Sequence, residues 1–228
     1  MLTIEKTVLP SPDQWEIIIE GMRNPMNSWD KSDSHGEWIE YDGMYVGMDA
    51  HAFTIGNNDH QLMTSLAKGG AVHAKYRRMI PVFLTINAPL YWWKEFDTYK
   101  VGTVANSCST MHKIHSKEFT LDDFSCEHLT HFAQDGELCR DWLGDLEDLI
   151  DDLNLARGLY LIHKDKKYWW QMIQLLPTSY NQKRTVMLNY EVLVNIYHSR
   201  KNHKLDEWHI FCDWIRNLPH SDLITMGE

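Results

Sequence analysis

The stretch MIPVFLTINAPLYWWKEF, residues 79–96, decides the fold. Its first part, residues 79–86, is a short run of mostly apolar and β-branched side chains, which predicts a buried strand. Pro89 then starts a helix, because proline is well tolerated in a first helical turn. Trp93 and Phe96 would give this helix an apolar face. A strand followed at once by a helix indicates a mixed α/β protein.

Before this stretch the sequence predicts one strand and two helices. Residues 3–9 are the expected strand. Residues 11–13, Ser-Pro-Asp, open the first helix, because serine is a favoured N-cap and proline a favoured first helical residue. Residues 57–59, Asn-Asn-Asp, cap the second helix, which ends at the glycine pair 69–70. Residues 30–56 lack a helical period and are rich in aspartate, glycine and aromatic side chains, so we expect loops and short strands there.

After this stretch the clearest pattern is a helix over about residues 136–156. Its apolar side chains recur with the spacing of an amphipathic helix. They are Trp142, Leu143, Leu146, Leu149, Ile150 and Leu153. The opposite face carries the carboxylates of Asp141, Asp145, Glu147, Asp148, Asp151 and Asp152. We interpret this acidic face as solvated rather than as a metal or acid/base site. Two more helices are expected, at about 184–201 and 204–217.

No repeat, low-complexity tract or flexible linker divides the sequence, so we expect a single domain over residues 1–228. The charge balance of 22 Lys+Arg against 32 Asp+Glu gives a net charge of −10, which argues against nucleic acid as a partner. The four cysteines are widely spaced, as in reduced intracellular thiols. No apolar run approaches the ~20 residues needed to cross a bilayer. We therefore expect a cytoplasmic protein without a membrane-spanning segment.

Two histidine patterns raise the alternative of a zinc site. His112 and His115 are one helical turn apart, and Cys126, His128 and His131 form a second cluster. Zinc sites usually show tighter cysteine pairs or an HExxH pattern, so we expect no metal and interpret these histidines as surface or hydrogen-bonded residues. The tryptophan pairs at 92–93 and 169–170 could stack on a flavin, but such large apolar rings are more often core residues.

Three segments of the sequence are informative because of their order along the chain. HAKYRR occupies residues 73–78, and NAPLYWWKEFDTYKVGTVANSCS occupies residues 87–109. A Leu-Pro step at 176–177 is followed by NYEVLVNIYHSR at 189–200. This order is similar to that of the flavin-dependent thymidylate synthases. That family has a histidine-led loop, a strand ending in an Ala-Pro-like step, an RHRxxSxNxxS segment, a Leu-Pro step and a helix carrying Asn, Asn and Arg.

The last of these segments also suggests a binding site by itself. Asn189 and Arg200 lie three turns apart on nearly the same face of a helix, although Asn195 does not continue this stripe. Amide and guanidinium groups offer directional donors suited to a flavin ring, a ribose or a phosphate. The alternative is an ordinary solvated helix surface. The resemblance, which runs from about residue 9 to residue 219, favours the binding site.

The resemblance implies an α/β fold of the α+β type, with a central antiparallel sheet flanked by helices and helix in excess. It also implies a homotetramer with active sites between subunits. The residues expected to bind FAD are His73, Arg78, Asn106, Asn189, Asn195 and Arg200. The residues expected to bind a pyrimidine deoxynucleotide such as dUMP are Lys100, Ser109 and Arg200. NADPH and methylenetetrahydrofolate are the implied co-substrates, and the reduced flavin would carry the chemistry without a protein nucleophile.

Several positions depart from the family pattern. The RHR triplet falls on residues 99–101, Tyr-Lys-Val, or on 98–100 with one inserted residue. Met111 replaces an arginine and Glu191 replaces another, which reverses the charge. Lysine cannot reproduce a bidentate arginine clamp, so the remaining Lys100 does not restore the lost phosphate contacts.

Two functional hypotheses follow from these matches and departures. One is a divergent synthase that methylates dUMP or a related pyrimidine nucleotide. The other is an inactive homologue that now serves as a nucleotide-binding or protein-interaction module.

Overall fold

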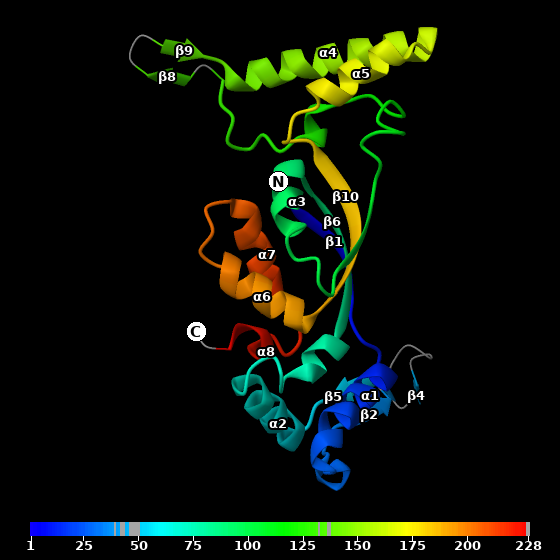
Figure 1. The fold of residues 1–228 in the computed structure, drawn as a ribbon, viewed down its shortest axis with the longest axis vertical. Helices are drawn as coiled ribbons and strands as arrows, with labels where there is room; N and C mark the ends of the chain where they lie inside the picture. Colours follow the sequence, from blue (N-terminus) through cyan, green and yellow to red (C-terminus); the bar gives the residue numbers. More distant parts are fainter. Residues whose placement is uncertain (39, 42–43, 46–50, 132, 136–137, 227–228) are drawn as a thin grey trace. The chain divides into compact units, whose positions relative to one another are not determined.

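A computed structural model describes residues 1–38, 40–41, 44–45, 51–131, 133–135 and 138–226 (Figure 1). The α-helices are α1 (Pro12–Arg23), α2 (Asn57–Lys68), α3 (Leu90–Phe96), α4 (Trp142–His163), α5 (Lys166–Leu175), α6 (Tyr190–Arg200), α7 (Asp206–Arg216) and α8 (Asp222–Thr225). Short 3₁₀ turns are η1 (Asn24–Met26), η2 (Trp29–Lys31), η3 (Lys75–Met79) and η4 (Leu121–Asp123).

The main sheet has four strands in the order β1-β6-β10-β7 and is antiparallel. Its strands are β1 (Thr3–Val8), β6 (Pro81–Pro89), β10 (Asn181–Asn189) and β7 (Val104–Ser107). Three antiparallel pairs accompany it: β2 (His35–Trp38) with β5 (His51–Thr54), β3 (Glu40–Tyr41) with β4 (Met44–Tyr45), and β8 (Ala133–Asp135) with β9 (Leu138–Arg140). The expected fold class, an antiparallel sheet with helices around it, is confirmed.

The chain divides into two compact units. The first comprises residues 1–5, 85–98 and 105–185, and the second comprises residues 6–84, 99–104 and 186–228. The single domain expected from the sequence stays a prediction. The two units differ in their internal contacts, which does not show whether either unit folds by itself.

The core of the first unit includes a cluster beneath α4 and α5, which lie side by side in Figure 1. Its buried members are Ile114, Phe119, Phe124, Leu146, Ile150, Leu153, Ala156 and Met172. The acidic side chains of α4 from Asp145 onward are exposed, as expected for a solvated face. Trp142 was expected on the apolar stripe, but it is 47% exposed.

The core of the second unit gathers on α6, α7 and α8. The fully buried aromatic side chains here include Tyr190, Tyr197, Trp208 and Phe211. Helix α7 buries one face because Trp208, Phe211, Cys212 and Ile215 recur at helical spacing. In this way α6, which carries two of the expected site residues, is held against its neighbours α7 and α8.

The helices differ from the sequence predictions in two boundaries and in one additional helix. The predicted helix at 184–201 begins only at Tyr190, because residues up to Asn189 belong to β10. The predicted helix at 136–156 runs instead from Trp142 to His163; residues 138–140 form β9, and residues 136–137 lie outside the described part. Helix α5 was not predicted.

The first two helices are capped at their N-termini in different ways. Ser11 caps α1 as expected, and Gln14 completes a capping box by accepting the Ser11 backbone N–H at 2.8 Å. The N-cap of α2 is Gly56 rather than an Asn or Asp of residues 57–59. The Asp33 carboxylate supplies the missing acceptor, because Asn58 N and Asp59 N both donate to it. A Cβ at position 56 would lie 2.2 Å from Asp33 Cγ, which explains the glycine.

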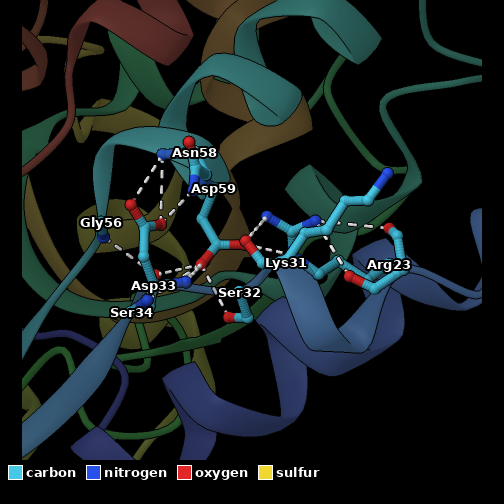
Figure 2. A network of polar contacts seen from close by, with 9 residues as sticks. Arg23, Lys31, Ser32, Asp33, Ser34, Gly56, Asn58 and Asp59 are labelled. Carbon is cyan, nitrogen blue, oxygen red and sulfur yellow. Dashed lines mark hydrogen bonds and ion pairs between the residues drawn. The ribbon is translucent and has the colours of Figure 1, made fainter.

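A buried ion pair between α1 and α2 anchors this region (Figure 2). Arg23 Nε donates to Asp59 Oδ1 at 2.5 Å, and both side chains are almost fully buried. The other Asp59 oxygen accepts from the backbone and hydroxyl groups of residues 32–34. The Arg23 guanidinium also donates to the carbonyl oxygens of Ser28 and Lys31. Both carboxylate oxygens of Asp59 therefore accept hydrogen bonds although they are buried, which indicates a structural role for the network.

Candidate functional site

A cavity of about 330 Å³ in the second unit collects several of the expected binding residues. It is lined by Ala71, Val72, Arg78, Val101, Gly102, Asn189, Glu191, Val192 and Asn195. We call it the α6 cavity, because four of these residues lie at or just before the first turns of α6. Its volume is at the lower end of the range for small-molecule sites, so it matches one mononucleotide or the ring end of a larger cofactor.

Helix α6 places its polar side chains in this cavity by its cap and by its period. Asn189 is the N-cap, and its Oδ1 accepts from Val192 N at 3.1 Å. This bond fixes the amide, and the Asn189 side-chain N–H groups remain as donors. Glu191 and Asn195 are four residues apart, so they share one helix face, and Val192 lies beside that face.

Gly102 forms a wall of the cavity in a conformation that other residues rarely adopt. Its φ is +82°, and a Cβ there would lie 3.1 Å from Asn189 Nδ2 and 3.2 Å from Val192 Cγ2. We expect Gly102→Ala to lower the free energy of unfolding by about 1–2 kcal/mol, because it adds backbone strain and crowds Asn189. Urea denaturation measures this change.

Gly158→Ala is the matched control for this prediction. Gly158 lies inside α4, and a Cβ there would meet nothing within 4 Å. Alanine is a better helix former, so the free energy of unfolding should rise by roughly 0.5–1 kcal/mol. An unchanged stability for Gly102→Ala would show that the left-handed turn is not required.

Among the described residues that line the α6 cavity, the charged side chains are one cation, Arg78, and one anion, Glu191. Arg78 is exposed and makes no hydrogen bond or ion pair with any residue that the structure describes. Glu191 lies 3.9 Å from Nη1 of the buried Arg77. A free guanidinium beside two amides suits a phosphate or a carboxylate on the ligand.

Other expected residues of the same unit lie outside the α6 cavity. His73 is exposed and lines a separate cavity of about 170 Å³. Lys100 is exposed and is not part of the cavity wall. Arg200 donates from Nε to the Tyr99 hydroxyl at 2.9 Å, and its guanidinium lies 4.9 Å from the Trp208 ring centre. These contacts hold Arg200 against aromatic rings, and Arg200 is not part of the α6 cavity wall. The binding role expected for Arg200 stays a prediction.

Asn106 and Ser109 belong to the first unit. Ser109 lines a polar cavity of about 660 Å³ there, and its Oγ accepts from Met111 N and His112 N. Asn106 is exposed on β7. Their expected roles stay predictions.

The structure also adds residues that sequence analysis did not select. Apart from Glu191, which was noted only as a departure, these are Ala71, Val72, Val101, Gly102 and Val192. The glycine of the sequence KVGT was the only available signal, because small and apolar residues carry no chemistry of their own.

The first tryptophan pair is part of the core, whereas Trp170 of the second pair is 42% exposed. Trp92 and Trp93 are fully buried, and Trp93 Nε1 donates to the Gln182 carbonyl at 2.8 Å, as the core interpretation predicted. His131 Nδ1 lies 2.8 Å from Asp141 Oδ1. Among the residues that the structure describes, no three His, Cys, Asp or Glu side chains are grouped to hold a metal ion.

Comparison with solved structures identifies the class of fold. Flavin-dependent thymidylate synthase ThyX from Helicobacter pylori, complexed with FAD and dUMP, is 15% identical, with a TM-score of 0.61 over 98% of this chain and 97% of that chain. A second structure of the Helicobacter pylori enzyme with FAD and dUMP is also 15% identical, with a TM-score of 0.62 over 99% and 97%. The chain therefore has the fold of the flavin-dependent thymidylate synthases.

A further structural relative is a methylase that acts on UMP as well as dUMP. The UMP/dUMP methylase PolB from Streptomyces cacaoi, bound with 5-Br dUMP, is 12% identical, with a TM-score of 0.55 over 95% of this chain and 88% of that chain. No model of a protein family matches the sequence, and no curated protein matches it either. The resemblance inferred from the sequence is thus confirmed at the level of the fold. In the described part of the chain, none of the helices combines the length and apolar composition needed to cross a bilayer.

Proposed function

We propose that this protein is a divergent flavin-dependent nucleotide methylase that binds a pyrimidine nucleotide in the α6 cavity. The observation that carries the proposal is the convergence of Arg78, Asn189 and Asn195 on one cavity, in a fold otherwise seen with bound FAD and dUMP. Arg78 would hold the phosphate, because it is a cation without a protein partner among the described residues. The amides of Asn189 and Asn195 would meet the edge of a base, which offers both donors and acceptors.

The two amides would also suit the ring end of a flavin, but the arginine beside them favours the phosphate of a nucleotide. A volume of about 330 Å³ is too small for the whole of FAD together with a nucleotide. The proposal therefore includes a homotetramer in which neighbouring subunits complete the site. His73, Arg200 and Asn106 would contact FAD, and Lys100 and Ser109 the nucleotide, only in that assembly.

When bound, the reduced flavin supplies the hydride that converts a one-carbon unit from methylenetetrahydrofolate into a methyl group, with NADPH as the reductant. The protein would hold the phosphate at Arg78, orient the base with the α6 amides and exclude water with Val101 and Val192. A cytoplasmic location belongs to the same proposal, since these co-substrates are small soluble metabolites.

Release of tritium from a pyrimidine nucleotide labelled at C5 tests this activity. The purified protein is incubated with FAD, NADPH, methylenetetrahydrofolate and labelled dUMP or UMP. Methylation at C5 displaces the C5 hydrogen, so we expect tritium in water only when all components are present. Release that does not require the folate would contradict the proposed methyl transfer.

A second candidate function is nucleotide binding without catalysis. The observation that favours it is the placement of Arg200, which is tied to Tyr99 and Trp208 instead of facing the cavity. Nucleotide binding without tritium release, in protein that has bound FAD, would support this alternative.

A further inference from the structure

Glu191 gives the α6 cavity a feature that its amides and arginine do not explain. Its Oε2 is buried and receives no hydrogen bond from any described residue. The side chain is 16% exposed and lines the cavity, so part of it is open to a ligand there. A buried acceptor without a donor is costly, and native structures normally supply one.

The nearest described cation does not satisfy this oxygen. Nη1 of Arg77 is 3.9 Å from Oε2, which balances charge but is too long for a hydrogen bond. The Arg77 guanidinium is held instead by the Leu223 carbonyl, to which Nη2 donates. Arg77 thus balances the negative charge of Glu191 but donates no hydrogen bond to Oε2.

We propose that Glu191 accepts hydrogen bonds from the ribose hydroxyls of the nucleotide, so that the cavity prefers a ribonucleotide to a deoxyribonucleotide. This inference rests on the proposed nucleotide binding. A carboxylate accepts only, so its partner must be a donor. At neutral pH the phosphate of a pyrimidine nucleotide mainly accepts hydrogen bonds, and Arg78 would donate to it. The α6 amides can satisfy the donors and acceptors of the base edge. The sugar hydroxyls remain.

Two chemical points support the sugar as the partner. Carboxylates recognise the 2′-hydroxyl of ribose in the dinucleotide-binding sites of α/β proteins. The two oxygens of one carboxylate also match the two neighbouring hydroxyls of a ribose, whereas a deoxyribose offers only one of them. The charge reversal at position 191 then alters sugar selection without removing nucleotide binding.

Calorimetric titration of the full chain with UMP and with dUMP tests the inference. We expect wild-type protein to bind UMP roughly ten- to a hundredfold more tightly, the range for a hydrogen bond to a charged group. Glu191→Gln removes the charge and should reduce this preference to a few-fold. Glu191→Asp keeps the charge near Arg77 but withdraws the carboxylate, so it should lose the preference even if the glutamine variant folds poorly. Asp152→Asn removes a carboxylate from the exposed face of α4 and should leave the ratio unchanged.

The possible results separate the inference from the proposed function. Equal affinities for UMP and dUMP would overturn the inference and leave nucleotide binding intact. A preference for UMP that is retained by both Glu191 variants would also overturn the inference, because another residue would then distinguish ribose from deoxyribose. Failure of the wild-type protein to bind either nucleotide, with and without FAD, would overturn the proposed function and this inference together.

Discussion

Asp59→Ala should lower the free energy of unfolding by about 3–5 kcal/mol, the range for removing one partner of a buried ion pair. The substitution leaves the buried Arg23 guanidinium without its carboxylate. It also leaves the backbone N–H groups of Asp33 and Ser34 without their acceptor, because both donate to Asp59 Oδ2. The loop before β2 and the start of α2 would both lose their anchor (Figure 2).

Urea denaturation at neutral pH measures this loss. Asp152→Asn is the control, since Asp152 is exposed on α4, and it should change the stability by less than about 0.5 kcal/mol. Should the alanine variant prove too unstable to purify, Ser34→Ala provides a milder test, because its hydroxyl donates to Asp59 and accepts from Gly56 N. A loss below about 1 kcal/mol for Asp59→Ala would contradict the anchoring role.

The same network predicts a loss of stability in acid. Burial alone would raise the pKa of Asp59, but hydrogen bonds from Ser34, Ser32, Arg23 and the Asp33 backbone outweigh it and lower the pKa below its usual value. A carboxyl with a depressed pKa in the folded state stabilises fully above its unfolded pKa of about 3.9, and this stabilisation is lost as pH falls through the folded pKa. Urea midpoints between pH 7 and pH 3 should therefore fall more in the wild-type protein than in the alanine variant.

Arg78→Ala should weaken nucleotide binding by roughly ten- to a hundredfold, the value of a hydrogen bond to a charged group. The sequence lacks the arginine triplet of the flavin-dependent thymidylate synthases that it resembles, and Arg78 is a cation in the α6 cavity wall. Because Arg78 is exposed and has no partner among the described residues, its removal should leave the stability almost unchanged. The loss should therefore appear in affinity alone.

Calorimetry with UMP measures this effect, and Lys6→Ala is the control because Lys6 is exposed on β1 and does not line the cavity. Arg78→Lys should recover only part of the affinity, since an ammonium cannot make the paired contacts of a guanidinium. Equal affinities for the wild-type and alanine proteins would place the phosphate elsewhere.

The fold could be predicted from the sequence where local signals agreed. The apolar run before Pro89 gave β6, and Ser11 with Pro12 gave the start of α1. The boundary between β10 and α6 was missed, because residues 184–200 contain no glycine or proline and apolar residues stand on both sides of it. The polar Asn189 was the available cue, since an asparagine before an apolar helical run is a favoured N-cap.

The candidate site was predictable only in part. Asn189 and Asn195 stood out because their amides carry chemistry, and Arg78 stood out because of its charge. The cavity also depends on a left-handed turn at Gly102 and on two valines, which no local pattern marks as functional. The aromatic contacts that hold Arg200 connect Tyr99 and Trp208, more than a hundred residues apart, and such a contact requires the tertiary structure.

The visible absorption spectrum of the purified protein, incubated with FAD and desalted, tests the central claim most directly. The account predicts that the protein retains a flavin band and that UMP shifts or quenches this band, since nucleotide and flavin would share one site. Arg78→Ala should retain the flavin and require more UMP for the same change. A protein that holds no flavin before or after incubation would contradict the account and leave the fold with another function.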